Sequence, residues 1–90
     1  MEFEFDSIKG QSNKVKHGID FIEAQALWKD EFYIESAARS DTENRFVVIG
    51  KIKRKHYSAF VTYRKEIVRI ISVRRSHKEE VALYESRRTR

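Results

Sequence analysis

Polar and apolar residues alternate at the start of the chain. Glu2–Phe5 reads Glu-Phe-Glu-Phe, which is the pattern of a short half-buried strand. Asp6 follows as an N-cap residue and predicts a first helix that runs to about His17. Gly18 stands where a C′ glycine ends a helix, so the pattern predicts a strand followed directly by a helix.

A second helix is predicted immediately afterwards. Asp20 and Glu23 have the spacing of a capping box, with Asp in the place of Ser or Thr. The helix is expected to end near Lys29–Asp30. Its apolar stripe is expected to pack in the core and consists of Phe21, Ala24, Leu27 and Trp28.

The rest of the chain carries apolar runs separated by polar and charged turns. Four strands are predicted, at Phe32–Glu35, Arg45–Gly50, Tyr57–Tyr63 and Ile67–Val73. The connections between them are a polar loop at Ala37–Thr42, a basic turn at Lys51–Lys55 and a turn at Arg64–Glu66. A second capping box, formed by Ser76 and Glu79, predicts a last helix through about Arg87.

The predicted order of elements is β-α-α-β-β-β-β-α. Short connections between successive strands favour an antiparallel meander, so we expect an α+β fold with an antiparallel sheet, two N-terminal helices and one C-terminal helix. The 90 residues contain no proline, no linker, no repeat and no low-complexity tract. This length and composition predict a single domain over residues 1–90.

Charge is distributed unevenly along the chain. Residues 1–45 hold 6 Lys/Arg and 10 Asp/Glu, a net charge of −4, whereas residues 46–90 hold 13 and 4, a net charge of +9. A basic half of this kind is typical of a surface that binds nucleic acid or another polyanion. A basic surface that only keeps the protein soluble is the alternative.

Several classes of function are disfavoured by the residues themselves. The chain has no cysteine, and its three histidines are far apart in sequence, so we expect no metal site and no cofactor. No apolar run approaches the roughly 20 residues of a membrane span, and the first residues do not resemble a signal peptide. We therefore expect a cytoplasmic protein without a membrane partner.

The last predicted strand carries cations where apolar residues would be expected. Arg69 interrupts an aliphatic run, and Arg74 stands where that run ends. A buried unpaired charge is very unfavourable, so each arginine either has an internal partner or faces an anion such as a phosphate. The two positions have opposite parity, so a regular strand would direct their side chains to opposite faces. Either a bulge near Ser72–Arg74 realigns them or only one of them contributes to a site.

Other polar residues stand at the ends of predicted elements: Lys16, His17, Arg45, Glu80 and Tyr84. Together with the two arginines, they supply the groups that RNA cleavage without a metal needs. These are a base for the 2′-OH, cations for the phosphate and an acid for the departing 5′-oxygen.

The whole chain resembles the BrnT family, small toxins of type II toxin–antitoxin systems. The shared motifs run almost from end to end: Phe3-x-Phe5-Asp6, Asn13-x-x-Lys16-His17-Gly18, Phe21-x-x-Ala24, Arg45 with Ile49-Gly50, Tyr63-Arg64, Arg69-Ile70-Ile71-Ser72-x-Arg74 and Glu79-Glu80-x-x-x-Tyr84-Glu85. The resemblance implies a RelE-like fold, a ribonuclease that cleaves cellular RNA and arrests growth, and a BrnA-like antitoxin. Such an antitoxin is a DNA-binding protein of ribbon-helix-helix type, through which the pair would bind operator DNA.

The leading hypothesis is a metal-independent endoribonuclease toxin. Arg69 and Arg74 are expected to bind the scissile phosphate, and His17 and Tyr84 are the candidates for proton transfer. Contacts to the RNA are expected from Lys16, Arg45, Lys53, Arg54 and Arg64, with Glu80 in a possible supporting role. Two alternatives are a non-catalytic nucleic-acid-binding module and an inactive toxin remnant that acts only as the antitoxin's partner.

Each of these residues also has a structural interpretation. Lys16 and His17 are cations suited to the C-terminal end of a helix. Arg69 is equally suited to an ion pair with Glu23 or Glu80, and Glu80 to a position on the surface. Tyr84 has the spacing of a side chain that packs the last helix onto the sheet.

Overall fold

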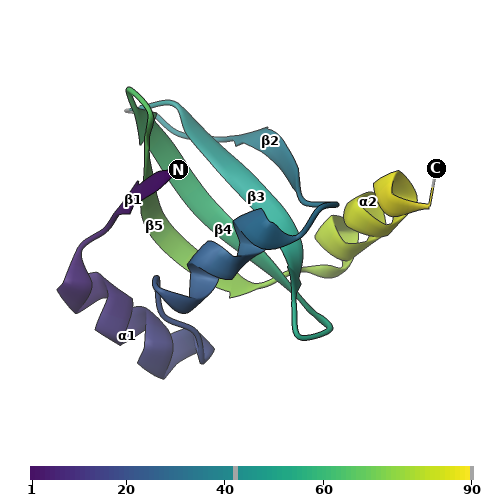
Figure 1. Ribbon diagram of the computed structural model, residues 1–90, viewed down its shortest axis with the longest axis horizontal. Coiled ribbons are helices and arrows are strands. Elements are labelled where there is room, and N and C mark those ends of the chain that lie inside the picture. The colour runs from purple at the N-terminus through teal and green to yellow at the C-terminus, as the bar shows by residue number, and fades with distance from the viewer. Residues whose placement is uncertain (42, 90) are drawn as a thin grey trace.

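The computed structural model describes residues 1–41 and 43–89 and contains one five-stranded sheet with three helices (Figure 1). The elements in chain order are β1 Glu2–Glu4, α1 Ser7–His17, η1 Glu23–Lys29, β2 Ile34–Ala38, β3 Arg45–Ile52, β4 Lys55–Arg64, β5 Ile67–Arg75 and α2 Lys78–Arg88. The predicted α+β class is confirmed, with one strand at the start and four consecutive strands before the last helix.

The sheet is mixed, and the prediction of a purely antiparallel sheet was wrong. The spatial order is β1-β5-β4-β3-β2, and the pairs among β2, β3, β4 and β5 are antiparallel. β1 instead runs parallel to β5, with Glu2 opposite Ile67 and Glu4 opposite Arg69. Short turns dictate antiparallel pairing between successive strands, whereas β1 reaches β5 only after all the other strands, so no turn fixes its direction.

The first helix forms as the sequence predicts. The Asp6 carboxylate accepts hydrogen bonds from the backbone N–H groups of Ile8 and Lys9, at 2.9 and 3.1 Å. Gly18 ends the helix with φ 76°, a left-handed conformation that glycine adopts without steric cost.

The second helix, η1, is a 3₁₀ helix rather than an α-helix. The Asp20 and Glu23 capping box forms, with hydrogen bonds in both directions. The buried residues Phe21, Ala24 and Leu27 are spaced by three, which is the period of a 3₁₀ helix. The predicted apolar stripe is confirmed, but its period is that of a 3₁₀ helix and not the predicted α-helical one.

Other predicted boundaries shift by a few residues. β2 begins at Ile34 and continues through Ala38, so part of the predicted loop is strand, and Thr42 lies outside the described residues. β4 extends at both ends, leaving only Lys53 and Arg54 in the β3–β4 turn. The last capping interaction is displaced by one residue, because the backbone N–H of His77, rather than of Ser76, donates to a glutamate three positions on.

One face of the sheet is closed by the N-terminal segments. The buried core contains Ile19, Phe21, Ala24 and Leu27 from the segments before β2, packed on Val48, Ala59, Val61, Val68, Ile70 and Val73 of the sheet. Phe3 and Trp28 pack against this core with ring centroids 4.9 Å apart. We call this side of the sheet the closed face, and it carries the hydrophobic core.

Helix α1 lies beside the edge of β5. The buried Asn13 amide donates to the carbonyl oxygens of Ile19 and Val73, and its own oxygen accepts from the Val73 N–H. β1 pairs only with Ile67, Val68 and Arg69, so Asn13 satisfies backbone groups of β5 that β1 does not reach.

Candidate functional site

A β-bulge in β5 brings Arg69 and Arg74 to the same face of the sheet. Val61 pairs with Ile70 and Phe60 pairs with Ser72, so Ile71 is the extra residue between them. Arg69 pairs with Thr62 and Arg74 pairs with Ser58, two residues of equal parity on β4. The bulge lies one residue before the predicted stretch Ser72–Arg74, and it realigns the two arginines.

These arginines lie on the side of the sheet opposite the closed face. We call this side of the sheet the open face. Strand pairing places on it one set of side chains from β3, β4 and β5: Arg45, Val47, Ser58, Phe60, Thr62, Arg69, Ser72 and Arg74. Helix α2 covers one end of this side, where Ile49 and Ser58 are buried (Figure 1). Cations, hydroxyl groups and one aromatic ring therefore share a surface that the N-terminal helices leave uncovered.

Arg74 is held by a network of hydrogen bonds at the start of α2. Its Nη1 and Nη2 donate to Oε1 and Oε2 of Glu80 at 2.7 and 3.0 Å, and Nη1 also donates to the Arg75 carbonyl. The guanidinium lies 5.1 Å from the centroid of the Phe60 ring. These bonds leave the Nε–H and one Nη2–H of Arg74 free to bind an anion.

Glu80 is the centre of this network. Burial alone would raise its pKa, but hydrogen bonds from Arg74, from the His77 backbone N–H and from Ser58 outweigh that effect and lower the pKa to about 2. Glu80 is therefore ionised at neutral pH. Glu80 is mostly buried and orients Arg74, so the structural alternative of a surface glutamate was wrong.

Arg69 has a looser environment at the opposite end of the open face. Its Nη1 lies 3.4 Å from Oε1 of Glu4, and Arg64 reaches the same oxygen at 3.9 Å. Neither Glu23 nor Glu80 is its partner, since Glu23 pairs with Lys14 and Glu80 with Arg74. About a third of the Arg69 side chain remains exposed, so the guanidinium is accessible to a ligand.

A histidine that was not among the predicted site residues lies on this side of the sheet. His56 has the parity of Ser58 on β4, and its Nε2 lies 2.7 Å from Oε2 of Glu85. His56 also packs edge-on against the Tyr84 ring, with centroids 5.2 Å apart. The signal was its two-residue spacing from Ser58, which the predicted strand concealed by starting one residue later.

Tyr84 is buried and bonded rather than exposed. It is 1 % exposed, and its hydroxyl donates to Oδ2 of Asp30 at 2.7 Å. Burial and this hydrogen bond both raise the pKa of the Tyr84 hydroxyl. The geometry therefore favours the structural interpretation, in which Tyr84 packs α2 against the sheet.

The remaining predicted residues are distributed over the molecule. His17 and Lys16 end α1, and within residues 1–41 and 43–89 no hydrogen bond or ion pair joins them to Arg69, Arg74 or Tyr84. Arg45 is on the open face beside Glu43, with a closest N–O separation of 3.4 Å. Lys53 and Arg54 occupy the β3–β4 turn, both with positive φ.

Comparison with known proteins supplies the family. Residues 5–80 match the model of a family described as "Ribonuclease toxin, BrnT, of type II toxin-antitoxin system". The chain belongs to the BrnT family. The matched stretch includes both arginines, His56 and Glu80, whereas Tyr84 and Glu85 follow it. Membership of a type II toxin–antitoxin family also implies an antitoxin partner for this BrnT protein.

The findings on curated relatives, and on membrane-spanning helices and metal sites in the described residues, are negative. No curated protein matches this BrnT chain. Among the described residues, no helix is long and apolar enough to cross a membrane. The same residues contain no group of three or more His, Cys, Asp or Glu side chains positioned to hold a metal ion.

Proposed function

We propose that this BrnT protein is a metal-independent endoribonuclease whose open face binds the scissile phosphate of RNA. The observation that carries the proposal is the bulge at Ile71, because it aligns Arg69 and Arg74 on one face. Their partners on β4, Thr62 and Ser58, are four residues apart, so the two arginines are separated by roughly 13 Å along the sheet. An RNA backbone that crosses this face would meet two permanently charged, planar donors.

The proposed chemistry uses groups on or beside this face. A base removes the proton from the 2′-OH, the 2′-oxygen forms a bond to phosphorus, and the bond from phosphorus to the 5′-oxygen breaks. The arginines stabilise the charge that develops on the phosphate. The products are a 2′,3′-cyclic phosphate and a 5′-OH end; the 5′-oxygen takes a proton from water, and the hydroxide that remains takes the proton from the protonated base.

His56 is the proton-transfer group that the geometry favours. Its side chain is mostly buried but shares a strand face with Ser58, which contacts the Arg74–Glu80 network. Glu85 holds one ring nitrogen at 2.7 Å, as a carboxylate does for a histidine base. His17 remains the other histidine to be tested, because it ends a helix whose residue Asn13 contacts β5.

Membership of the family also suggests the fold type, the place of action and the antitoxin partner. We infer a RelE-like fold, a cytoplasmic site of action on cellular RNA, and neutralisation by a BrnA-like antitoxin of ribbon-helix-helix type. An antitoxin segment with acidic and apolar residues would suit the open face or α2, with operator DNA bound only through the antitoxin. Support comes from family membership and from the arginines exposed on this face.

The deciding experiment is cleavage of RNA by the purified protein in EDTA. We expect cleavage to persist, and the products to carry 5′-OH and cyclic phosphate ends. His56→Gln should lose activity while His17→Gln retains it, and thermal melts should show that both variants are folded. Activity that disappears in EDTA and returns with magnesium would contradict the mechanism, and loss only in His17→Gln would reassign the base.

The bidentate Arg74–Glu80 pair also supports a second candidate function. An arginine already paired and stacked on Phe60 serves equally well in a non-catalytic RNA-binding surface or in an inactive toxin remnant. RNA binding without any cleavage would favour the binding module. Binding of the antitoxin alone would favour the remnant.

A further inference from the structure

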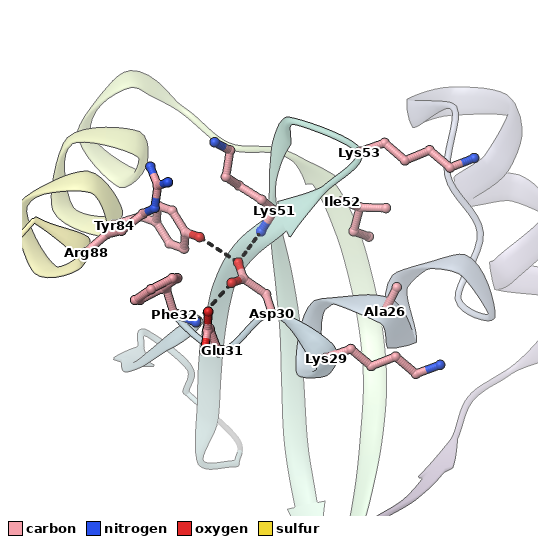
Figure 2. A pocket seen from close by; sticks show the side chains of 10 residues that line it. All are labelled: Ala26, Lys29, Asp30, Glu31, Phe32, Lys51, Ile52, Lys53, Tyr84 and Arg88. Carbon is pink, nitrogen blue, oxygen red and sulfur yellow. Dashed lines mark hydrogen bonds between the residues drawn. The ribbon is translucent and has the colours of Figure 1, made fainter.

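A basic cleft lies further along α2 from the Arg74–Glu80 pair, toward the end of that helix. It has a volume of about 630 Å³ and is formed where the end of η1, the β3–β4 hairpin and the end of α2 meet (Figure 2). We define this basic cleft by the residues Lys29, Asp30, Phe32, Lys51, Lys53 and Arg88. None of the roles proposed above for the open face requires it.

The floor of the basic cleft is fixed by the Asp30 carboxylate. It accepts hydrogen bonds from the Phe32 and Lys51 backbone N–H groups, at 2.9 and 2.8 Å, and from the Tyr84 hydroxyl at 2.7 Å. Figure 2 shows these three bonds converging on one side chain. The Asp30 carboxylate thus joins three segments, and it keeps its negative charge because all three donors are neutral.

Close packing beneath this floor depends on Gly50. A Cβ atom at that position would lie 3.2 Å from the Leu27 side chain and 3.3 Å from Oδ2 of Asp30. Residue 50 therefore has no room for a side chain without displacing the floor. The close packing at Gly50 thus fixes the backbone beneath the cleft.

The rim carries more positive than negative charge. Lys51 and Arg88 share one carboxylate, that of Glu85, with N–O separations of 4.0 and 3.2 Å. Lys29 and Lys53 extend away from Asp30 in Figure 2, and neither has an ion-pair partner in the part of the chain that the structure describes. Four cations and two carboxylates, Asp30 and Glu31, line the cleft, so an anion is the favoured occupant.

An exposed aromatic ring stands among these cations. Phe32 is 42 % exposed, and the Arg88 guanidinium lies 5.7 Å from the centroid of its ring. Figure 2 shows Arg88 next to Phe32 at the α2 side of the cleft. An exposed ring beside arginine and lysine is the arrangement on which proteins stack the bases of single-stranded nucleic acid.

The β3–β4 turn adds an independent indication. Lys53 and Arg54 have φ values of 49° and 72°, in the left-handed region that strongly favours Asn and Gly in two-residue hairpins. The chain retains two cations there despite the backbone strain. Strained positions of this kind concentrate where side chains contribute to binding.

We propose that the basic cleft is a nucleotide subsite for single-stranded RNA, with a base stacked on Phe32 and its phosphates held by Arg88 and the lysines. The proposal rests on the proposed function, since it extends the RNA path beyond the scissile phosphate. Glu80, Tyr84 and Arg88 are four residues apart and follow one face of α2. The path from Arg74 to the cleft is therefore about 12 Å along this helix.

The test is binding of a fluorescent, single-stranded 2′-O-methyl RNA, which lacks the attacking hydroxyl. We expect Phe32→Leu to weaken binding about five-fold or more through lost stacking. The double variant Lys29→Gln/Lys53→Gln should lower the slope of log K against log salt by about 1. Lys9→Gln, an exposed cation on α1, is the matched control and should change affinity less than two-fold. Melting curves should show all variants folded.

The outcomes separate this proposal from the nuclease assignment. If the variants bind RNA as tightly as the parent, the subsite is wrong, whatever the cleavage assay shows. If they keep RNA affinity but lose antitoxin affinity, the cleft is an antitoxin site and the proposal is overturned. If binding falls as expected but the parent protein never cleaves RNA, the subsite is supported and the endoribonuclease assignment fails.

Discussion

The two faces of the sheet are made by the same strands yet differ in composition and cover. On the closed face, Ala59, Val61 and Val73 are fully buried under η1 and the segment before it. On the open face, their sequence neighbours include Arg69 and Arg74, which keep about a third and a quarter of their side chains exposed.

This contrast shows how a chain of 90 residues combines stability and chemistry in one sheet. Apolar burial on the closed face supplies the dominant favourable contribution to folding. The open face needs no deep core, because ion pairs and hydrogen bonds hold its cations in place. Because side chains alternate between the two faces along each strand, residues of one face can be substituted without changing those of the other.

The largest expected effect comes from moving a cation to the other face of the sheet. The double variant Val73→Arg/Arg74→Val exchanges two neighbouring residues of β5, so the guanidinium would take the place of a fully buried valine in the core. An unpaired buried charge there should cost roughly 3–5 kcal/mol. We expect this variant to be unfolded by circular dichroism, with no cleavage.

Deleting Ile71 is the control, because it removes the extra residue of the bulge and leaves every pair between β4 and β5 in place. The deletion variant should therefore keep Arg74 on the open face and retain the fold. A folded and active Val73→Arg/Arg74→Val protein would show that the facing of this cation decides neither stability nor activity.

The next effect compares adjacent residues on opposite faces. Arg69→Ala should lower the cleavage rate about 10²–10³-fold, by analogy with loss of one oxyanion donor. Its loose contact with Glu4 predicts a change in unfolding free energy of at most about 1 kcal/mol. Val68→Ala should instead cost about 2 kcal/mol of stability and leave the rate of the folded protein nearly unchanged.

Urea unfolding and cleavage assays on both variants check this expectation. An Arg69→Ala protein that is inactive because it is badly destabilised would make Arg69 structural. Equal loss of rate in both variants would remove the distinction between the two faces.

The closed face is readable from the sequence, because apolar periodicity is a local signal. The spacing of Phe21, Ala24 and Leu27 predicts their place in the core, and Asp6 and Gly18 are recognisable as helix ends. The details that were misassigned are those that local patterns do not carry. The parallel pairing of β1 and the 3₁₀ geometry of η1 depend on contacts between distant segments.

The candidate site was predicted only in part. Arg69 and Arg74 stood out because cations rarely interrupt a buried strand, but their common face depends on a bulge whose position the sequence left open. The partners Glu4, Glu80 and Glu85 come from other elements, so ion pairing could not be assigned from spacing. Tyr84 was noticed for its spacing on α2, while its bond to Asp30 required the fold.

Lowering the pH should weaken the Arg74–Glu80 pair on the open face before it affects the closed face. The pKa of Glu80 is lowered to about 2, so its contribution is fully present above the ordinary glutamate value of about 4.5. That contribution is lost as the pH falls toward 2 and amounts to about 3 kcal/mol. Urea unfolding of the parent at pH 7, 4 and 2.5 measures this loss.

Glu80→Gln should flatten the pH dependence below pH 4.5, because the residue no longer titrates. Glu79→Gln, the exposed neighbour on α2, should preserve it. If Glu79→Gln flattens the curve and Glu80→Gln does not, the Arg74–Glu80 pair is not the acid-sensitive contact.

The smallest effect concerns the strained turns at the two ends of the sheet. Replacing Lys53-Arg54 by Asn-Gly should stabilise the protein by about 1 kcal/mol or more, because these residues suit the left-handed backbone of a two-residue hairpin. Lys65→Gly relieves the same strain in the β4–β5 turn, where φ is 57°, and should also stabilise by about 1 kcal/mol. Only the first change removes cations beside the basic cleft, so only it should weaken binding of single-stranded RNA.

Thermal melts and RNA titrations on both variants provide the measurement. Equal RNA affinity in the two variants would mean that the strain at Lys53 and Arg54 has no role in binding, and the turn would then be an ordinary hairpin connection like the one at Lys65.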